Sequence, residues 1–170
     1  MHTVIVWTAQ YLLFVLAAAF AMVWLVAENR RGKLLLAIAA AVGVVLMVGL
    51  LYLAQDLHHD PRPFVDNPHI KPLFPHNRDD GFPSDHSLAA ALIAGLTAWR
   101  HRLIGAFMAL GAVAIAWARV AAHVHHLQDV LAGLALGAVA AVLASLAADW
   151  VLSRMDTSRG ESATAASTTG

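Results

Sequence analysis

Long apolar runs separated by short polar connections make up most of the chain. Five such runs occur, at residues 3–27, 34–54, 87–99, 103–118 and 130–148. About 20 apolar residues cross a bilayer as a helix, so the longer runs are candidate membrane spans. The third run gives a helix of 16 residues if it starts near Ser84, roughly 24 Å at a rise of 1.5 Å per residue. The pattern predicts an all-α bundle of about five transmembrane helices, with the third starting below the membrane surface.

Small residues and a polar tail complete the pattern. Glycines that suit close helix packing in lipid lie in the last two runs: Gly105, Gly111, Gly133 and Gly137. The end of the chain from Thr157 is small and polar, which is typical of disorder. We therefore expect one membrane-embedded domain over residues 1–156 and a disordered cytoplasmic tail over 157–170.

Composition supports a membrane protein. Hydrophobic residues are 59% of the 170 residues and charged residues only 13%, about half the share usual in soluble domains. The formal net charge is zero, which argues against a nucleic-acid partner. There is no cysteine, which excludes disulfides and thiolate metal sites. Nothing in the composition indicates an oligomeric state.

Lys and Arg predict the orientation. With five spans, the basic connections around residues 28–33 and 100–102 and the flank holding Arg154 and Arg159 share one side. The positive-inside rule makes that side the cytoplasm. The N-terminus and the connections 55–85 and 119–127 then face outward, in a bacterial plasma membrane toward the periplasm or the outside. Those two outward connections hold seven of the ten histidines.

The first polar cluster is QDLHHDPRPF, residues 55–64. Arg62 lies between Pro61 and Pro63, and proline on both sides makes this backbone stiff and non-helical. A guanidinium held this way suits bidentate recognition of phosphate oxygens. The alternative is an arginine that extends to lipid headgroups.

The second polar cluster is GFPSDHS, residues 81–87. Proline followed by Ser84 and Asp85 before an apolar run predicts a helix start. Free N–H groups and the helix dipole favour an anion there, and His86 would lie in the first turn beside it. The alternative is an ordinary N-cap with a surface histidine.

The third polar cluster is ARVAAHVHHLQD, residues 118–129. His125 and Asp129 are four residues apart, so on a helix they share a face, and the carboxylate could fix the imidazole tautomer and leave the other nitrogen free to attack. Arg119 needs a bend in the chain to reach the same site. The alternative is a polar loop whose histidines cap helix ends.

Together the clusters predict phosphoryl transfer on the outward face. Arginines would stabilise charge on the phosphate oxygens, while one histidine attacks phosphorus and the other protonates the leaving oxygen. This chemistry requires His125 to be neutral and His86 to be cationic at the same pH.

The three clusters resemble the three signature motifs of the type 2 phosphatidic acid phosphatase (PAP2) superfamily. The match rests on Arg62-Pro63, on PSDH at 83–86, and on the spacing of Arg119, His125 and Asp129. PSDH is reminiscent of the small bacterial branch that dephosphorylates undecaprenyl pyrophosphate.

The resemblance implies a metal-independent phosphatase without cofactors, on a core like that of vanadium haloperoxidases. It implies that His125 is the nucleophile, that Asp129 orients it and that His86 is the general acid. Phosphate would be held by a further set: Arg62, Arg119, and the helix start at Ser84 and Asp85.

The chain departs from the family pattern at two positions. Gln55 stands where the first motif has lysine, so one phosphate-binding charge is missing, and Lys71 or Arg78 could substitute. Ala118 replaces the serine of the third motif.

Other functions fit parts of the pattern. A metal hydrolase could draw its ligands from the outward loops, namely His58, His59, His123, His125, His126, Asp56, Asp60 and Asp129. A non-enzymatic protein that binds or transports anionic lipid would use the same arginines. Within the family, phosphatidylglycerol phosphate or phosphatidic acid are alternative substrates. We interpret His123 and His126 as loop histidines and Asp79-Asp80 as a solvated turn.

Overall fold

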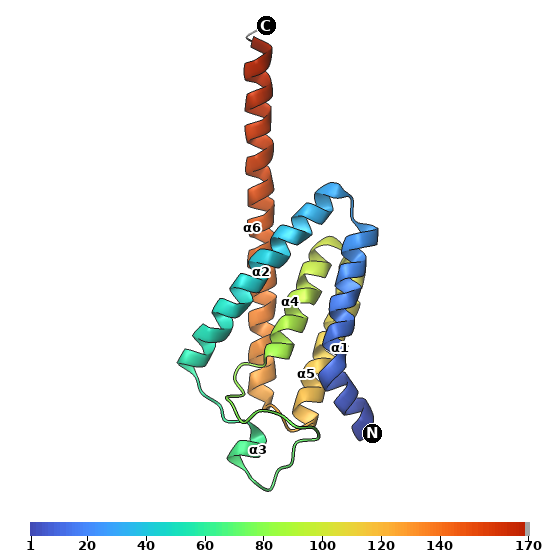
Figure 1. Cartoon of the computed structure of the whole chain (residues 1–170), viewed down its shortest axis with the longest axis vertical. Helices are drawn as coiled ribbons and strands as arrows, with labels where there is room; N and C mark the ends of the chain where they lie inside the picture. Colours follow the sequence, from blue (N-terminus) through green and yellow to red (C-terminus); the bar gives the residue numbers. More distant parts are fainter. Residues whose placement is uncertain (169–170) are drawn as a thin grey trace.

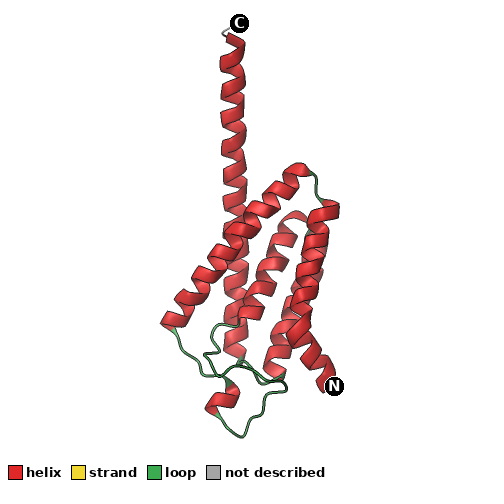
Figure 2. Ribbon diagram, viewed as in Figure 1, coloured by secondary structure: helices red, strands yellow, loops and turns green. Residues whose placement is uncertain are grey.

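The apolar runs form helices. The computed structural model describes the backbone of residues 1–168 and the side chains of residues 1–155. Its helices, in chain order, are α1 (His2–Met22) with the π-helical turn η1 (Val23–Ala27), α2 (Arg30–Leu57), α3 (Pro63–Asp66), α4 (Asp85–Arg100), α5 (Arg102–Ala121) and α6 (Leu127–Thr168). No strand occurs among these residues, which confirms the all-α prediction (Figures 1 and 2).

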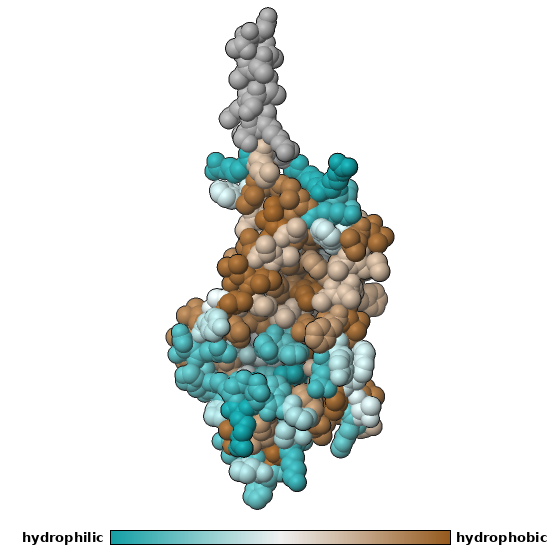
Figure 3. All heavy atoms as spheres, in the orientation of Figure 1, coloured by the Kyte–Doolittle hydropathy of each residue, from teal (hydrophilic) through white to brown (hydrophobic). Residues whose placement is uncertain are grey.

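Four of the helical segments are long and apolar enough to cross a membrane. They comprise residues 2–27, 30–57, 102–121 and 127–155. The remaining expected span, third in the chain, is α4. It has 16 residues, as its apolar run predicted. Large apolar side chains such as Val45 and Phe107 point outward, at 71% and 73% exposure, as expected for surfaces that face lipid. A brown apolar band crosses the middle of the molecule in Figure 3.

The short helix α4 is the centre of the bundle. One of its faces packs Leu92 and Leu96 against α2 and the alanines of α6. Another face packs Ala90 and Ala94 against α1 and α5. In Figure 1 it lies between the α1–α5 pair and the α2–α6 pair. A helix surrounded in this way can start below the membrane surface without exposing its polar first turn to lipid.

Glycines set how closely helices approach α4. A Cβ at Gly137 would lie 2.2 Å from the Leu88 carbonyl, and one at Gly133 would lie 2.5 Å from the Ser84 carbonyl. A Cβ at Gly105 would lie 2.3 Å from Ala98. These contacts confirm the expected packing role of the glycines.

The two ends of the bundle differ. The N-terminus, α3 and the long connections lie at one end, and the C-terminal part of α6 extends from the other (Figure 1). At that second end the buried Glu28 accepts two hydrogen bonds from Arg100, at 3.0 and 3.1 Å, and lies 3.1 Å from a ring nitrogen of His101. The two basic connections are therefore joined by a carboxylate.

The polar end of the chain was expected to be a disordered tail over residues 157–170. The structure continues α6 through this stretch to Thr168, and residues 169–170 lie outside the described part. The boundary at residue 156 stays a prediction.

Candidate functional site

The predicted phosphate arginine Arg62 points into the bundle. It caps the short helix α3, with Pro63 as the first helical residue, and its side chain is buried. Nη1 donates to the Val124 carbonyl at 2.9 Å and lies 3.2 Å from Nε2 of His125. Nε donates to Asp79 Oδ1 at 2.9 Å. Burial and these contacts exclude the alternative of an arginine reaching for lipid headgroups.

Arg119 reaches the same nitrogen from the last turn of α5. Its Nη2 lies 3.2 Å from His125 Nε2, and its exposed fraction is 2%. The required bend is present: α5 ends at Ala121, and His123 has the left-handed φ of 60°. The chain therefore turns back before α6 begins at Leu127.

His125 and Asp129 form the predicted pair. Nδ1 of His125 lies 3.3 Å from Oδ2 of Asp129, and both side chains are buried. They do not share a helical face, because His125 precedes α6. Asp129 lies in its first turn and also accepts the His126 N–H at 2.8 Å, which is the backward hydrogen bond of a capping box. One carboxylate thus caps the helix and holds the imidazole.

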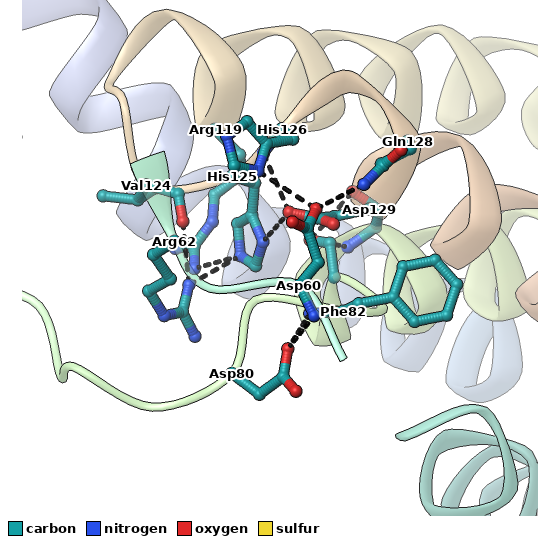
Figure 4. Close-up of polar contacts among 12 residues, drawn as sticks. Asp60, Arg62, Asp80, Phe82, Arg119, Val124, His125, His126, Gln128 and Asp129 are labelled. Carbon is teal, nitrogen blue, oxygen red and sulfur yellow. Dashed lines mark hydrogen bonds and ion pairs between the residues drawn. The ribbon is translucent and has the colours of Figure 1, made fainter. Parts of the chain in front are cut away.

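The contacts of His125 define its tautomer. Asp129 accepts the proton on Nδ1, so the lone pair of Nε2 faces the two guanidinium groups (Figure 4). Burial lowers the pKa of His125, the Asp129 hydrogen bond raises it, and the positive charges of Arg119 and Arg62 lower it; the net direction is downward from 6.5. His125 is therefore neutral at neutral pH, as the predicted chemistry requires.

The start of α4 agrees with prediction in its position and differs in its contacts. Ser84 is the N-cap, and its Oγ accepts the Ser87 N–H at 3.4 Å. The Ser84 amide, expected to hold phosphate, instead donates to the Asp129 carbonyl at 3.0 Å. Gly133 allows α4 and α6 to approach this closely, so the amide is used in packing.

His86 lies in the first turn of α4, as predicted. Its Nδ1 is 2.9 Å from Asp85 Oδ1, so Nε2 is left for another partner. Asp85 was predicted as a phosphate contact. Its carboxylate instead accepts from His86, and a carboxylate repels phosphate, so Asp85 orients the histidine.

His76 belongs to the site and was not found from the sequence. Its Nε2 lies 2.9 Å from Arg119 Nη2, and its ring centroid is 6.3 Å from that of His125. Burial and the charges of Arg62 and Arg119 lower its pKa to about 4, so it is a neutral acceptor. It lies on an irregular loop without a motif, so only tertiary structure could reveal it.

A cavity of about 390 Å³ opens beside these residues. Its lining includes Arg119, His76 and His86, together with Gln10 and Tyr11 from α1. Arg119 thus contacts both the cavity and His125, and the volume is within the range of small-molecule sites.

The candidate zinc ligands do not gather as one set. His58 packs edge-on against Phe82, and His59 pairs with Asp80 at 2.7 Å. Only Asp60, His126 and Asp129 place ligand atoms within 4.8 Å of one another among the described residues. His126 is therefore more than a loop histidine, with Nδ1 3.0 Å from Asp60 Oδ2.

Asp79 and Asp80 hold the loop in place, which corrects their interpretation as a solvated turn. Asp79 binds Arg62, and Asp80 Oδ1 accepts the N–H groups of Asp60 and Phe82 at 2.8 and 3.1 Å. Asp79, which lies outside the three motifs, thus orients Arg62, the predicted phosphate-binding arginine.

The positions that depart from the family pattern are also placed. Gln55 lies in the last turn of α2, and Ala118 is buried in an apolar cluster. Lys71 contacts His123 through its carbonyl, and Arg78 lines a separate hollow with Asp79 and Asp80. Among the described residues, neither Lys71 nor Arg78 forms a hydrogen bond with His125, whose side-chain partners are Arg62, Arg119 and Asp129.

Comparison with known proteins shows the family to which the chain belongs. The chain matches the family model described as PAP2 superfamily over residues 56–152, which contain Arg62-Pro63, PSDH at 83–86 and the stretch from Arg119 to Asp129. The putative undecaprenyl-diphosphatase YbjG of Escherichia coli (strain K12) is 32% identical over 147 residues, 86% of this chain and 73% of that protein. The bacitracin transport permease protein BcrC of Bacillus licheniformis is 29% identical over 84% of this chain and 69% of its own length. The undecaprenyl-diphosphatase BcrC of Bacillus subtilis (strain 168) is 27% identical over 82% and 70%.

Solved structures share the fold. Aquifex aeolicus LpxE superposes with a TM-score of 0.60 at 23% identity, covering 84% of this chain and 82% of that one. A transmembrane PAP2 type phosphatidylglycerolphosphate phosphatase from Bacillus subtilis gives 0.56 at 23% identity, covering 84% and 74%. At this identity the likeness concerns the arrangement of helices.

Proposed function

Because the chain belongs to the PAP2 superfamily, we propose that it is a lipid phosphatase that hydrolyses a polyprenyl pyrophosphate, undecaprenyl pyrophosphate, to the monophosphate. The family and the membrane helices were both expected from the sequence and are confirmed. The observation that carries the catalytic proposal is the position of the His125 ring. Its Nε2 lies 3.2 Å from an Nη atom of each buried arginine, and its Nδ1 lies 3.3 Å from the Asp129 carboxylate.

This geometry supports nucleophilic attack. Arg62 and Arg119 bind the terminal phosphate and neutralise charge on its oxygens. Arg119 Nε is a buried donor without a partner among the described residues. A phosphate bound beside Arg119 can therefore accept a further hydrogen bond from this N–H group. Nε2 of His125 forms the bond to phosphorus while the bond to the bridging oxygen breaks, and Asp129 stabilises the imidazolium.

The proton for the leaving group comes from His86. It lines the cavity beside Arg119, and Asp85 holds its Nδ1. His86 protonates the leaving lipid monophosphate and then takes a proton from the water that hydrolyses the phosphohistidine. No step requires a metal ion.

The substrate proposal rests on the relatives and on orientation. Two of the curated relatives carry undecaprenyl-diphosphatase in their names. Arg30, Arg31, Lys33, Arg100 and Arg102 lie at the end opposite the site. By the positive-inside rule the site then faces the periplasm or outside of a bacterial plasma membrane, with the N-terminus out and the C-terminus in.

The test is phosphate release by detergent-purified protein in EDTA. Undecaprenyl pyrophosphate, phosphatidylglycerol phosphate and phosphatidic acid are compared at equal mole fraction. We expect the pyrophosphate to be preferred, and we expect His86→Ala to reduce release by about 10²–10⁴-fold. Preference for a monoester lipid would reassign the substrate. Tight lipid binding without release would favour an anionic-lipid binding or transport protein.

A further inference from the structure

A second group of ligand-type side chains shares Asp129 with the His125 contact. Asp60, His126 and Asp129 each offer one ligand atom, and these atoms lie within 4.8 Å of one another. Asp60 comes from the loop after α2, and the other two come from the start of α6. Figure 4 shows the Asp60 carboxylate directed at Asp129.

Asp129 has an oxygen without a partner in this group. Its Oδ2 accepts from His125 and from the His126 N–H. Its Oδ1 is buried and has no hydrogen-bond partner among the described residues, and the residue is 0% exposed. A buried, unpaired carboxylate oxygen beside a second carboxylate is costly unless a cation or a shared proton lies between them.

The loop keeps Asp60 in position. Its N–H donates to Asp80 at 2.8 Å, and its carbonyl accepts the Gly81 N–H at 2.9 Å. Gln128 Nε2 donates to Asp60 Oδ2 at 2.6 Å. A ligand that is held by outer hydrogen bonds loses little conformational freedom when it binds a metal.

We propose that Asp60, His126 and Asp129 form an inhibitory site for a divalent transition cation such as Zn²⁺. Two carboxylates and one imidazole nitrogen are a ligand set that Zn²⁺ accepts, with water completing the coordination. The cation would replace the proton on His126 Nδ1 and bind Asp129 through Oδ1. Both guanidinium groups lie at Nε2 of His125, so the imidazole separates them from the cation.

The inhibition follows from the shared carboxylate, and this part rests on the proposed function. Attack by His125 creates an imidazolium, which the negative charge of Asp129 stabilises. A cation on Oδ1 neutralises that charge and lowers turnover without touching the phosphate pocket. The same side chain thus connects the cation site to the nucleophile.

The test is calorimetric titration of EDTA-stripped, detergent-purified protein with ZnCl₂. We expect one Zn²⁺ per chain, and at least about tenfold weaker binding in Asp60→Asn and in His126→Gln. Asp66→Asn and His69→Gln are matched controls, because both are exposed residues of the connection between α2 and α4 that also carries Asp60; they should bind Zn²⁺ like the parent. Size-exclusion profiles check that each variant is folded.

The activity arm uses the same variants. We expect Zn²⁺ to inhibit phosphate release over the range in which it binds, and Asp60→Asn to remain active in EDTA and resist inhibition. Absence of binding, or equal binding by Asp60→Asn and His126→Gln, would overturn the site and favour a proton shared by the carboxylates. Activation by Zn²⁺ would overturn the inhibitory role. Absence of release in EDTA and in Zn²⁺ would refute the proposed function while the calorimetry still decides the site.

Discussion

His125 is the residue on which the site's polar contacts converge. Two arginines reach its Nε2, and one carboxylate holds its Nδ1. Its environment works in two directions: burial and the arginines lower its pKa, and the Asp129 hydrogen bond raises it. The balance keeps a neutral nucleophile ready at neutral pH.

Replacing Asp129 with asparagine changes that balance in a predictable direction. Only neutral imidazole attacks, so kcat/KM of the parent falls as the pH drops through the His125 pKa, below 6.5. Asp129→Asn removes a contribution that raises this pKa, so the acid limb should move to lower pH. The plateau should fall by about 10²–10⁴-fold through loss of tautomer control. A pH profile of phosphate release measures both; an acid limb that stays in place or moves upward would contradict the assignment.

The sequence could predict part of this site. The spacing of Arg119, His125 and Asp129 is local, and a short polar stretch in an apolar chain is conspicuous. The role of His76 and the pairing of Asp60 with His126 depend on loops that meet only in the folded chain. The hydrogen bond from the Ser84 amide could not be predicted, because its partner, the Asp129 carbonyl, is 45 residues away in sequence.

At the scale of elements, the packing of α4 against α6 positions the site. The start of α4 carries His86, the start of α6 carries Asp129, and the hydrogen bond from the Ser84 amide joins them. The apolar runs predicted both helices, and the run before residue 100 with a start near Ser84 predicted the length of α4. It could not predict which helix lies at the centre, because that depends on packing at both of its faces.

Gly137→Ala should disturb this packing. The new Cβ would lie 2.2 Å from the Leu88 carbonyl, so the helices must move apart, at a cost of about 1–3 kcal/mol. Gly49→Ala is the matched control, since a Cβ there meets nothing within 4 Å. Thermal unfolding in detergent should show a lower Tm for Gly137→Ala and an equal or higher Tm for Gly49→Ala. Equal Tm values would show that the α4–α6 contact is looser than the structure indicates.

The whole molecule has two polar ends separated by an apolar band (Figure 3). The end opposite the site carries Arg30, Arg31, Lys33, Arg100 and Arg102. The sequence predicted this difference between the two ends, because the connections rich in Lys and Arg alternate along the chain with the connections that hold the motifs. The Glu28 contact with Arg100 shows what counting charges omits: the basic end also contains a buried acid, whose pKa Arg100 lowers first of all by hydrogen bonding.

The orientation can be tested by labelling, because the chain contains no cysteine. His69→Cys places a thiol at the site end and Arg30→Cys places one at the opposite end. In spheroplasts of a bacterial host, a membrane-impermeant maleimide should label His69→Cys at once and Arg30→Cys only after permeabilisation. The reverse pattern would place the site in the cytoplasm.

The most direct test of the central claim is to trap the phosphoenzyme. Protein mixed with substrate carrying ³²P in its terminal phosphate is quenched in alkali, where a phosphohistidine survives, and the label on the chain is counted. We predict label on the parent protein and on Asp66→Asn, and none on folded His125→Ala. Label that persists in His125→Ala would place the nucleophile elsewhere. Phosphate release by the parent with no trapped label at any quench time would contradict the covalent mechanism.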